Sequence, residues 1–265
     1  MRRLAKLLAL VVLAAAGDAL ASETGVRLEP ALVDRHDVES LQRGARNFVN
    51  YCLNCHSAQH MRYNRLTDLR LSESQIQNNL MFATDKFGST MTAAMTRAEG
   101  AAWFGVPPPD LTVEARIRGN DWLYSYFLAF YKDDASTTGW NNLVFPNVAM
   151  PHVLWGLSGT QKLVETMYDD YDKAEAAAIA AKGLALAEKL ANGKYVVKTL
   201  APDTPGTLTP TEYTGFVADL VNYLDYMAEP VRNERINIGI VVMIYLGILF
   251  AFAYALKRNY WKDIH

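Results

Sequence analysis

Both ends of the chain carry hydrophobic runs. Residues 7–16 are apolar and follow a basic start, and Ala19-Leu20-Ala21 closes the segment. This pattern is typical of a secretory signal with an A-x-A cleavage site, so we predict a signal peptide over residues 1–21. An uncleaved membrane anchor is the alternative, although the apolar run is short for a bilayer span.

The second run, residues 236–256, is 21 residues long and contains no Asp, Glu, Lys or Arg. At about 1.5 Å per residue, a helix of this length crosses the roughly 30 Å hydrocarbon core of a bilayer. Basic residues dominate the tail, residues 257–265, so the positive-inside rule predicts that the tail is cytoplasmic. The sequence therefore predicts that residues 22–235 form an exported domain with a single C-terminal membrane anchor.

Between the two runs, apolar positions at four-residue spacing predict helices. Gly44, Phe48 and Cys52 share one helical face, and the glycine lets another helix approach closely. A second helix is predicted from Thr209, where a capping box precedes an apolar stripe that ends before Pro230. The spacing of the first helix resembles that of class I cytochromes c, in which this helix crosses the C-terminal helix of the domain. The resemblance therefore implies that the two helices cross and bracket the domain.

The segment between the predicted helices contains one more helical pattern. Residues 174–191 are rich in alanine and are predicted to form a helix closed by Asn192-Gly193. Residues 195–200 are predicted to form a short strand. Because the other patterns are helical, the predicted fold class is mainly α.

Composition and charge narrow the class of partner. Hydrophobic residues make up 51% of the 265 positions and charged residues 20%, which excludes collagen-like and low-complexity chains. Residues 1–21 and 236–265 together contain two of the 28 acidic and six of the 26 basic residues. Residues 22–235 therefore carry a net charge of −6. This sign argues against nucleic acid and permits a basic protein partner. Acidic residues between Glu165 and Glu175 form either a solvated face or a docking patch.

Both cysteines fall in one motif, Cys52-Leu53-Asn54-Cys55-His56. C-x-x-C-H is the attachment signature of c-type haem, in which the two thiols form thioethers and the histidine binds the iron. A disulfide oxidoreductase would carry C-x-x-C in an α/β chain, and a structural zinc site would need more Cys or His ligands nearby. We therefore expect one covalently bound haem c, held by Cys52, Cys55 and His56.

The second axial position of the iron decides between electron transfer and chemistry on a bound small molecule. Met150 lies in a loop stiffened by Pro146 and Pro151, which favours it as the ligand. A thioether ligand raises the reduction potential relative to a second imidazole. The alternatives are His152, another methionine or an open site.

The remaining candidates fit less well. His60 follows His56 by four positions, so on a helix it would lie on the same side of the iron and not opposite it. Met81, Met91 and Met95 lie closer to the motif in sequence. Methionines at helical spacing are usually core residues, so Met91 and Met95, four positions apart, are interpreted as core or loop residues.

The order of these features resembles the cytochrome c1 family, the haem c subunits of the cytochrome bc1 complex, in its bacterial form. C-x-x-C-H alone is shared by all c-type cytochromes, whereas the 94 positions from His56 to Met150 and the anchored tail are more specific. The resemblance covers most of the chain. The matching segments are residues 50–57, 107–111, 115–116, 120–122, 145–151, 223–230 and 254–261.

The resemblance implies a class I cytochrome c-like haem domain with a single C-terminal transmembrane helix. It makes His56 and Met150 the axial ligands and Cys52 and Cys55 the thioether donors.

The resemblance also assigns residues around the haem. Pro108 and Pro109 match prolines that pack near the proximal face. Arg116 matches an arginine that approaches a haem propionate, a role that nearby Arg118 could fill instead. Trp122 stands where the family often has tyrosine, so a hydroxyl contact is not expected there.

As a function, the resemblance implies an electron relay. The chain would accept electrons from the Rieske iron-sulfur protein and pass them to a c-type cytochrome, without being an enzyme on its own. The anchor would lie in membrane lipid beside cytochrome b, within a dimeric complex. Two alternatives remain: a membrane-anchored monohaem cytochrome c that serves a terminal oxidase, and a haem sensor or peroxidase with an open distal site.

Overall fold

The computed structural model describes residues 25–181 and 183–262, so the predicted signal peptide lies outside the described residues. The helices are α2 (Val38–Tyr51), the 3-10 helix η1 (Tyr63–Leu69), α3 (Glu73–Leu80), α4 (Arg97–Phe104), α5 (Glu114–Arg118), α6 (Asn120–Leu128), α7 (Trp155–Ser158), α8 (Tyr171–Ala180), α9 (Pro210–Ala228) and α10 (Arg232–Tyr260). The strands are β1 (Ala58–Arg62), β2 (Thr90–Met91), β3 (Phe130–Lys132), β4 (Trp140–Asn142), β5 (Gly159–Tyr168), β6 (Ala185–Lys189) and β7 (Tyr195–Pro205).

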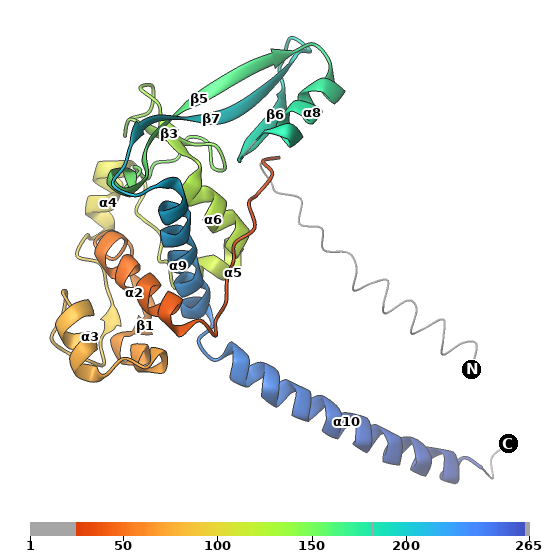
Figure 1. The fold of residues 1–265 in the computed structure, drawn as a ribbon. Helices are drawn as coiled ribbons and strands as arrows, with labels where there is room; N and C mark the ends of the chain where they lie inside the picture. Colours follow the sequence, from red (N-terminus) through yellow and green to blue (C-terminus); the bar gives the residue numbers. More distant parts are fainter. Residues whose placement is uncertain (1–24, 182, 263–265) are drawn as a thin grey trace.

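Helices α2 and α9 cross at Gly44 (Figure 1). A Cβ atom at this position would lie 2.1 Å from the carbonyl oxygen of Asp219 in α9, so a larger residue could not be accommodated without a shift of the helices. Beside the crossing, the rings of Phe48 and Tyr223 lie 5.7 Å apart and are fully buried. The predicted pair of crossing helices is confirmed.

Helix α9 begins with the predicted capping box. The amide of Thr209 donates to the carboxylate of Glu212 at 2.8 Å, and the amide of Glu212 donates back to the Thr209 hydroxyl at 3.3 Å. After Ala228 a short turn leads into α10, which extends away from the rest of the fold (Figure 1). Among the described residues, α10 is the helix long and apolar enough to cross a membrane, with a mean hydropathy of 2.4 and no buried residue in its apolar window.

A five-stranded sheet covers the other end of the molecule, in the order β4-β3-β5-β7-β6. Strands β5 and β7 form a long antiparallel ribbon that projects from the helical part, and α8 lies beside it (Figure 1). Strands β1 and β2 form a separate antiparallel pair. The expectation of a mainly α fold is therefore only partly right.

The prediction of a helix over residues 174–191 is wrong beyond Ala180, where α8 ends. Gly183 has φ +100°, a conformation that interrupts a helix, and residues 185–189 then form β6. In β6, Leu186 pairs with Lys198 of β7. The alanines favour a helix only locally, and pairing with a distant strand outweighs that preference. The predicted strand over residues 195–200 is confirmed and extends to Pro205.

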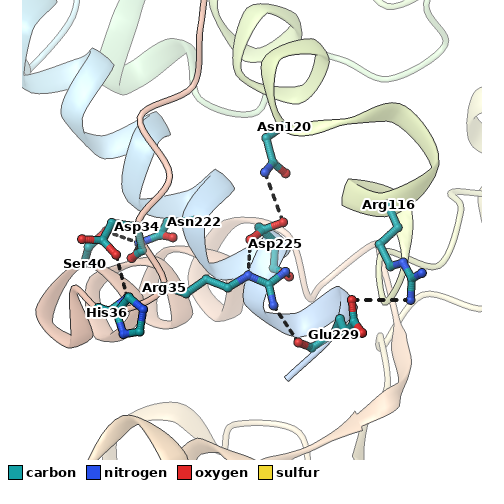
Figure 2. Close-up of polar contacts among 9 residues, drawn as sticks. All are labelled: Asp34, Arg35, His36, Ser40, Arg116, Asn120, Asn222, Asp225 and Glu229. Atoms are coloured by element: carbon teal, nitrogen blue, oxygen red, sulfur yellow. Dashed lines mark hydrogen bonds and ion pairs between the residues drawn. The ribbon is translucent and has the colours of Figure 1, made fainter. Parts of the chain in front are cut away.

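The N-terminal segment, residues 25–37, is bound to the end of α9. Figure 2 shows the Arg35 guanidinium between Asp225 and Glu229. It donates to the Asp225 carboxylate, to the Asp225 carbonyl oxygen at 2.6 Å and to the Glu229 carbonyl oxygen at 2.7 Å. Asn120, the first residue of α6, donates to the same carboxylate at 3.1 Å. This cluster joins the N-terminal segment, α6 and the last turn of α9.

Candidate functional site

One cavity brings together residues from distant parts of the chain. Its volume is about 300 Å³, it is partly open to solvent, and it lies within the size range of ligand pockets. Most of its lining is apolar. The lining includes Tyr51, Cys52, Cys55, His56, Phe104, Val106, Pro107, Pro108, Pro109, Leu111, Arg118, Trp122, Leu123, Tyr126, Phe127, Phe145, Val148, Ala149, Met150, Pro151, Val153 and Leu224.

The end of α2 presents the cysteines and histidine of the motif to this cavity. The amide of Cys52 donates to the carbonyl oxygen of Phe48 at 2.9 Å, and the amide of His56 donates to the carbonyl oxygen of Cys52 at 2.9 Å. The chain therefore turns tightly after the helix. Both cysteines are free, Cys52 buried and Cys55 partly exposed. Burial, with a smaller effect of Cys55, raises the pKa of Cys52 to about 12. A redox-active C-x-x-C pair has the opposite property, a lowered thiol pKa.

His56 is oriented by the segment that follows α4. Its Nδ1 donates to the carbonyl oxygen of Pro109 at 2.8 Å, which leaves the Nε2 lone pair available to a metal. Burial lowers the pKa of His56, although the Pro109 hydrogen bond partly opposes this effect, so the neutral ring is favoured. Pro108 also lines the cavity, and its ring packs closely against Gly100 of α4.

Met150 lines the same cavity as His56, although the two residues lie 94 positions apart. The hydroxyl of Tyr126 donates to its sulfur at 3.3 Å. The Tyr126 ring stacks on Trp122 of the same helix, with centroids 5.1 Å apart and planes at 10°. Sequence reasoning missed Tyr126. Its spacing of four from Trp122 was the available signal, since both residues then lie on one face of α6.

The other candidate axial ligands lie elsewhere. His152 is buried but stacks on Phe130 at 4.7 Å, and its Nε2 is 2.8 Å from the Ser158 hydroxyl. His60 is exposed, and Met91 is fully buried against the hydroxyl of Tyr223 at 3.6 Å. None of these residues lines the cavity, and neither do Met81 and Met95.

Of the two arginines of α5, one lines the cavity and the other does not. Arg116 does not line the cavity: its side chain is 60% exposed and lies 3.8 Å from Glu229 (Figure 2). Arg118 lines the cavity, with its guanidinium carbon 4.9 Å from the centre of the Trp122 ring. The expected position at the cavity wall is thus filled by Arg118 and not by Arg116, because residues two apart on a helix face different directions.

These residues fit a haem c. An imidazole nitrogen and a thioether sulfur are characteristic axial ligands of cytochrome c iron, and two free cysteines stand beside the histidine. An apolar lining suits a porphyrin, and the Arg118 guanidinium suits a propionate. Among the described residues, no group of three His, Cys, Asp or Glu side chains could hold a metal ion.

Comparison with known proteins identifies the family. The family model described as "Cytochrome C1 family" matches residues 29–264. The chain is 44% identical to cytochrome c1 of Allochromatium vinosum, with 100% of both chains covered. It is also 44% identical to a protein of Nitrosomonas europaea named ammonia monooxygenase gamma subunit, over 99% of this chain and 100% of that protein. Cytochrome c1 of Rhodospirillum rubrum is 26% identical, over 96% and 94%. The chain therefore belongs to the cytochrome c1 family, whose members carry covalent haem c and serve as electron-transfer subunits of the cytochrome bc1 complex.

Proposed function

We propose that this chain relays electrons from the Rieske iron-sulfur protein to a c-type cytochrome, as part of a bacterial ubiquinol–cytochrome c reductase. The observation that carries the proposal is the presence of His56 and Met150 on one cavity, beside both cysteines. A haem c bound there supplies a one-electron iron couple. Family membership and the 44% identity to a cytochrome c1 support the assignment to this complex.

Each residue of the motif has a distinct role in this proposal. Cys52 and Cys55 form the thioethers, and His56 provides the proximal nitrogen. Pro109 holds the His56 ring through the 2.8 Å hydrogen bond and thereby fixes its orientation toward the cavity. Pro108 lines the same cavity. The tight turn after α2 keeps these groups together because their backbones are hydrogen-bonded.

Met150 provides the distal ligand, so no axial position remains open for a substrate. This favours electron transfer over sensing or peroxidase chemistry. Of the alternative ligands, His152 is held by Phe130 and Ser158, away from the cavity.

Helix α5 supplies the positive charge for a propionate. Arg118 lies at the cavity wall and pairs at 3.3 Å with Glu114, which also lines the cavity. The resemblance assigns the role to Arg116, whose exposed side chain is outside the lining and pairs with Glu229 at 3.8 Å. We assign the role to Arg118, and separate substitutions of the two arginines test this choice.

The membrane topology in this proposal rests on the two hydrophobic segments near the chain ends. Residues 1–21 act as the signal, residues 22–235 lie in the periplasm, residues 236–256 span the inner membrane beside cytochrome b, and residues 257–265 lie in the cytoplasm. The exposed apolar surface of α10 and the basic residues Lys257, Arg258 and Lys262 at its C-terminal end support this arrangement. The net charge of −6 on residues 22–235 would attract a basic acceptor cytochrome. The complex as a whole would be a dimer.

The test uses the full-length, haem-loaded protein purified from membranes in mild detergent. We expect co-purification with cytochrome b and the Rieske protein, and a ferric spectrum with the weak red charge-transfer band of thioether-bound haem, lost in Met150→Ala. Co-purification with a terminal oxidase would instead support the oxidase alternative. A five-coordinate wild-type iron that binds carbon monoxide when reduced would overturn the relay and support a sensor or peroxidase.

A further inference from the structure

The loop that contains Met150, residues 143–151, is held at its start by a buried asparagine. Asn142, the last residue of β4, has no exposed surface. Its Oδ1 accepts hydrogen bonds from the amides of Val144 at 2.9 Å and Phe145 at 3.0 Å. Its Nδ2 donates to the carbonyl oxygen of Tyr126 at 2.8 Å. One side chain therefore joins the first turn of the loop to helix α6.

The neighbouring asparagine holds the middle of the same loop. The Oδ1 of Asn141 accepts from the amide of Asn147 at 2.8 Å, and its Nδ2 donates to Asp133 at 2.8 Å. Asn147 has φ +60°, a left-handed conformation that costs energy for residues other than glycine and persists only where contacts hold it. The path of the loop is thus fixed from β4 by two side chains in sequence.

Tyr126 contacts the loop at both ends. Its carbonyl oxygen accepts from Asn142 before the loop, and its hydroxyl donates to the sulfur of Met150 near the end of the loop. The ring itself cannot move freely, since it stacks on Trp122 and meets Phe130 edge to face at 5.0 Å. The contacts therefore form a closed circuit at the cavity wall, which runs from Asn142 through the loop to Met150 and back through Tyr126.

A hydrophobic residue at position 142 could not replace these bonds. The amide of Val144 would lose its partner in a fully buried place, where water does not substitute. The amide of Phe145 and the carbonyl of Tyr126 would each lose a bond to Asn142, although this carbonyl keeps the Ala129 amide as a donor at 3.2 Å. The loop would then leave this path to satisfy its amides, and the sulfur of Met150 would move with it.

We propose that Asn142 is the positioning residue for the Met150 ligand. This inference rests on the proposed function, in which Met150 binds the iron. Asn142 touches neither the metal nor the porphyrin in this role. It fixes the start of the loop relative to Tyr126, and so keeps the thioether within bonding reach and limits its dissociation.

The test compares haem-loaded Asn142→Asp and Asn142→Ser proteins with wild type. Asp keeps the size and the two acceptor bonds but loses the donor to Tyr126, whereas Ser is too short to span the gap. We expect a partial loss of the red charge-transfer band in Asn142→Asp and a nearly complete loss in Asn142→Ser. The reduction potential should fall, and the reduced forms should bind carbon monoxide, in the same order.

Asn222→Ser is the matched control. Asn222 is 1% exposed and donates to the Asp34 carbonyl at 2.8 Å and the Ser40 hydroxyl at 3.0 Å (Figure 2). It lies far from the loop in sequence and does not line the cavity. It should lower stability and leave the band, the potential and the inertness to carbon monoxide unchanged.

Two results would overturn the inference. One is an Asn142→Ser protein that loses stability like the control but keeps the band and the wild-type potential. The other is an Asn142→Asp protein that loads haem with wild-type band and potential while Asn142→Ser fails to load, since Asn142 would then serve folding alone. Met150→Ala, measured in parallel, distinguishes a failure of the ligand assignment from a failure of the positioning role. If the charge-transfer band persists in Met150→Ala, Met150 is not the ligand. If Met150→Ala loses the band and the Asn142 variants keep it, Met150 is the ligand but Asn142 does not position it.

Discussion

Arg35 and Asp225 form an ion pair across 190 positions of sequence, with side chains only 10% and 9% exposed (Figure 2). The guanidinium also binds the carbonyl oxygens of Asp225 and Glu229 and so satisfies the C-terminal end of α9. Because α9 crosses α2 and leads into α10, this pair ties the N-terminal segment to the centre of the fold.

Removing Arg35 should therefore cost much more than removing an exposed arginine. Arg35→Ala leaves the Asp225 carboxylate buried without its cation, and we expect a loss of about 3–5 kcal/mol in the free energy of unfolding. Arg65→Ala is the control, since Arg65 and Asp68 are 41% and 39% exposed and such pairs contribute about 0–1 kcal/mol. Denaturant unfolding of both variants measures the difference. Equal losses in the free energy of unfolding would show that the buried pair stabilises the fold no more than the exposed pair does.

The crossing of α2 and α9 gives a second prediction. Gly44→Ala places a methyl group against the Asp219 carbonyl, and we expect it to destabilise the fold by about 1–3 kcal/mol. Gly215→Ala, in the same α9, meets no atom within 4 Å and should be neutral or stabilising by up to about 1 kcal/mol. Thermal unfolding of the two variants tests this, and a tolerated Gly44→Ala would mean that the helices can separate at no cost.

The hydrogen bond from Tyr126 to Met150 should adjust the reduction potential. In Tyr126→Phe the sulfur loses a donor and becomes a better ligand for the ferric state, so the potential should fall by the equivalent of up to about 1 kcal/mol. Tyr223→Phe is the matched control, because its hydroxyl contacts the sulfur of Met91 away from the cavity. Redox titration of the haem-loaded proteins distinguishes the two, and an equal shift in both would contradict a direct effect on Met150.

The two arginines of α5 can be separated in the same way. A cation near the haem favours the reduced state, so we expect Arg118→Ala to lower the reduction potential and Arg116→Ala to change it little. A larger drop in Arg116→Ala would instead support the residue assigned by the family resemblance. Arg116→Ala also removes an ion pair with Glu229, which is the reason to record stability alongside the potential.

Local features of the sequence predicted local features of the protein. The capping box at Thr209 and the spacing of Gly44, Phe48 and Cys52 predicted the helices that the structure contains, because caps and helical faces depend on residues a few positions apart. Residues 185–189 show the limit of this reasoning. Their alanines favour a helix, but backbone pairing with the eleven-residue strand β7 decides for a strand.

By itself, the sequence determined the haem attachment chemistry and the apolar C-terminal helix. Cys52, Cys55 and His56 are adjacent in the chain, and the length and hydrophobicity of α10 are sums over consecutive residues. Only the tertiary structure decided which distant side chains share the cavity with them. It brought Met150, Tyr126 and Arg118 to the cavity and left His152 and Arg116 outside it, because packing and hydrogen bonds between segments far apart in sequence set these directions.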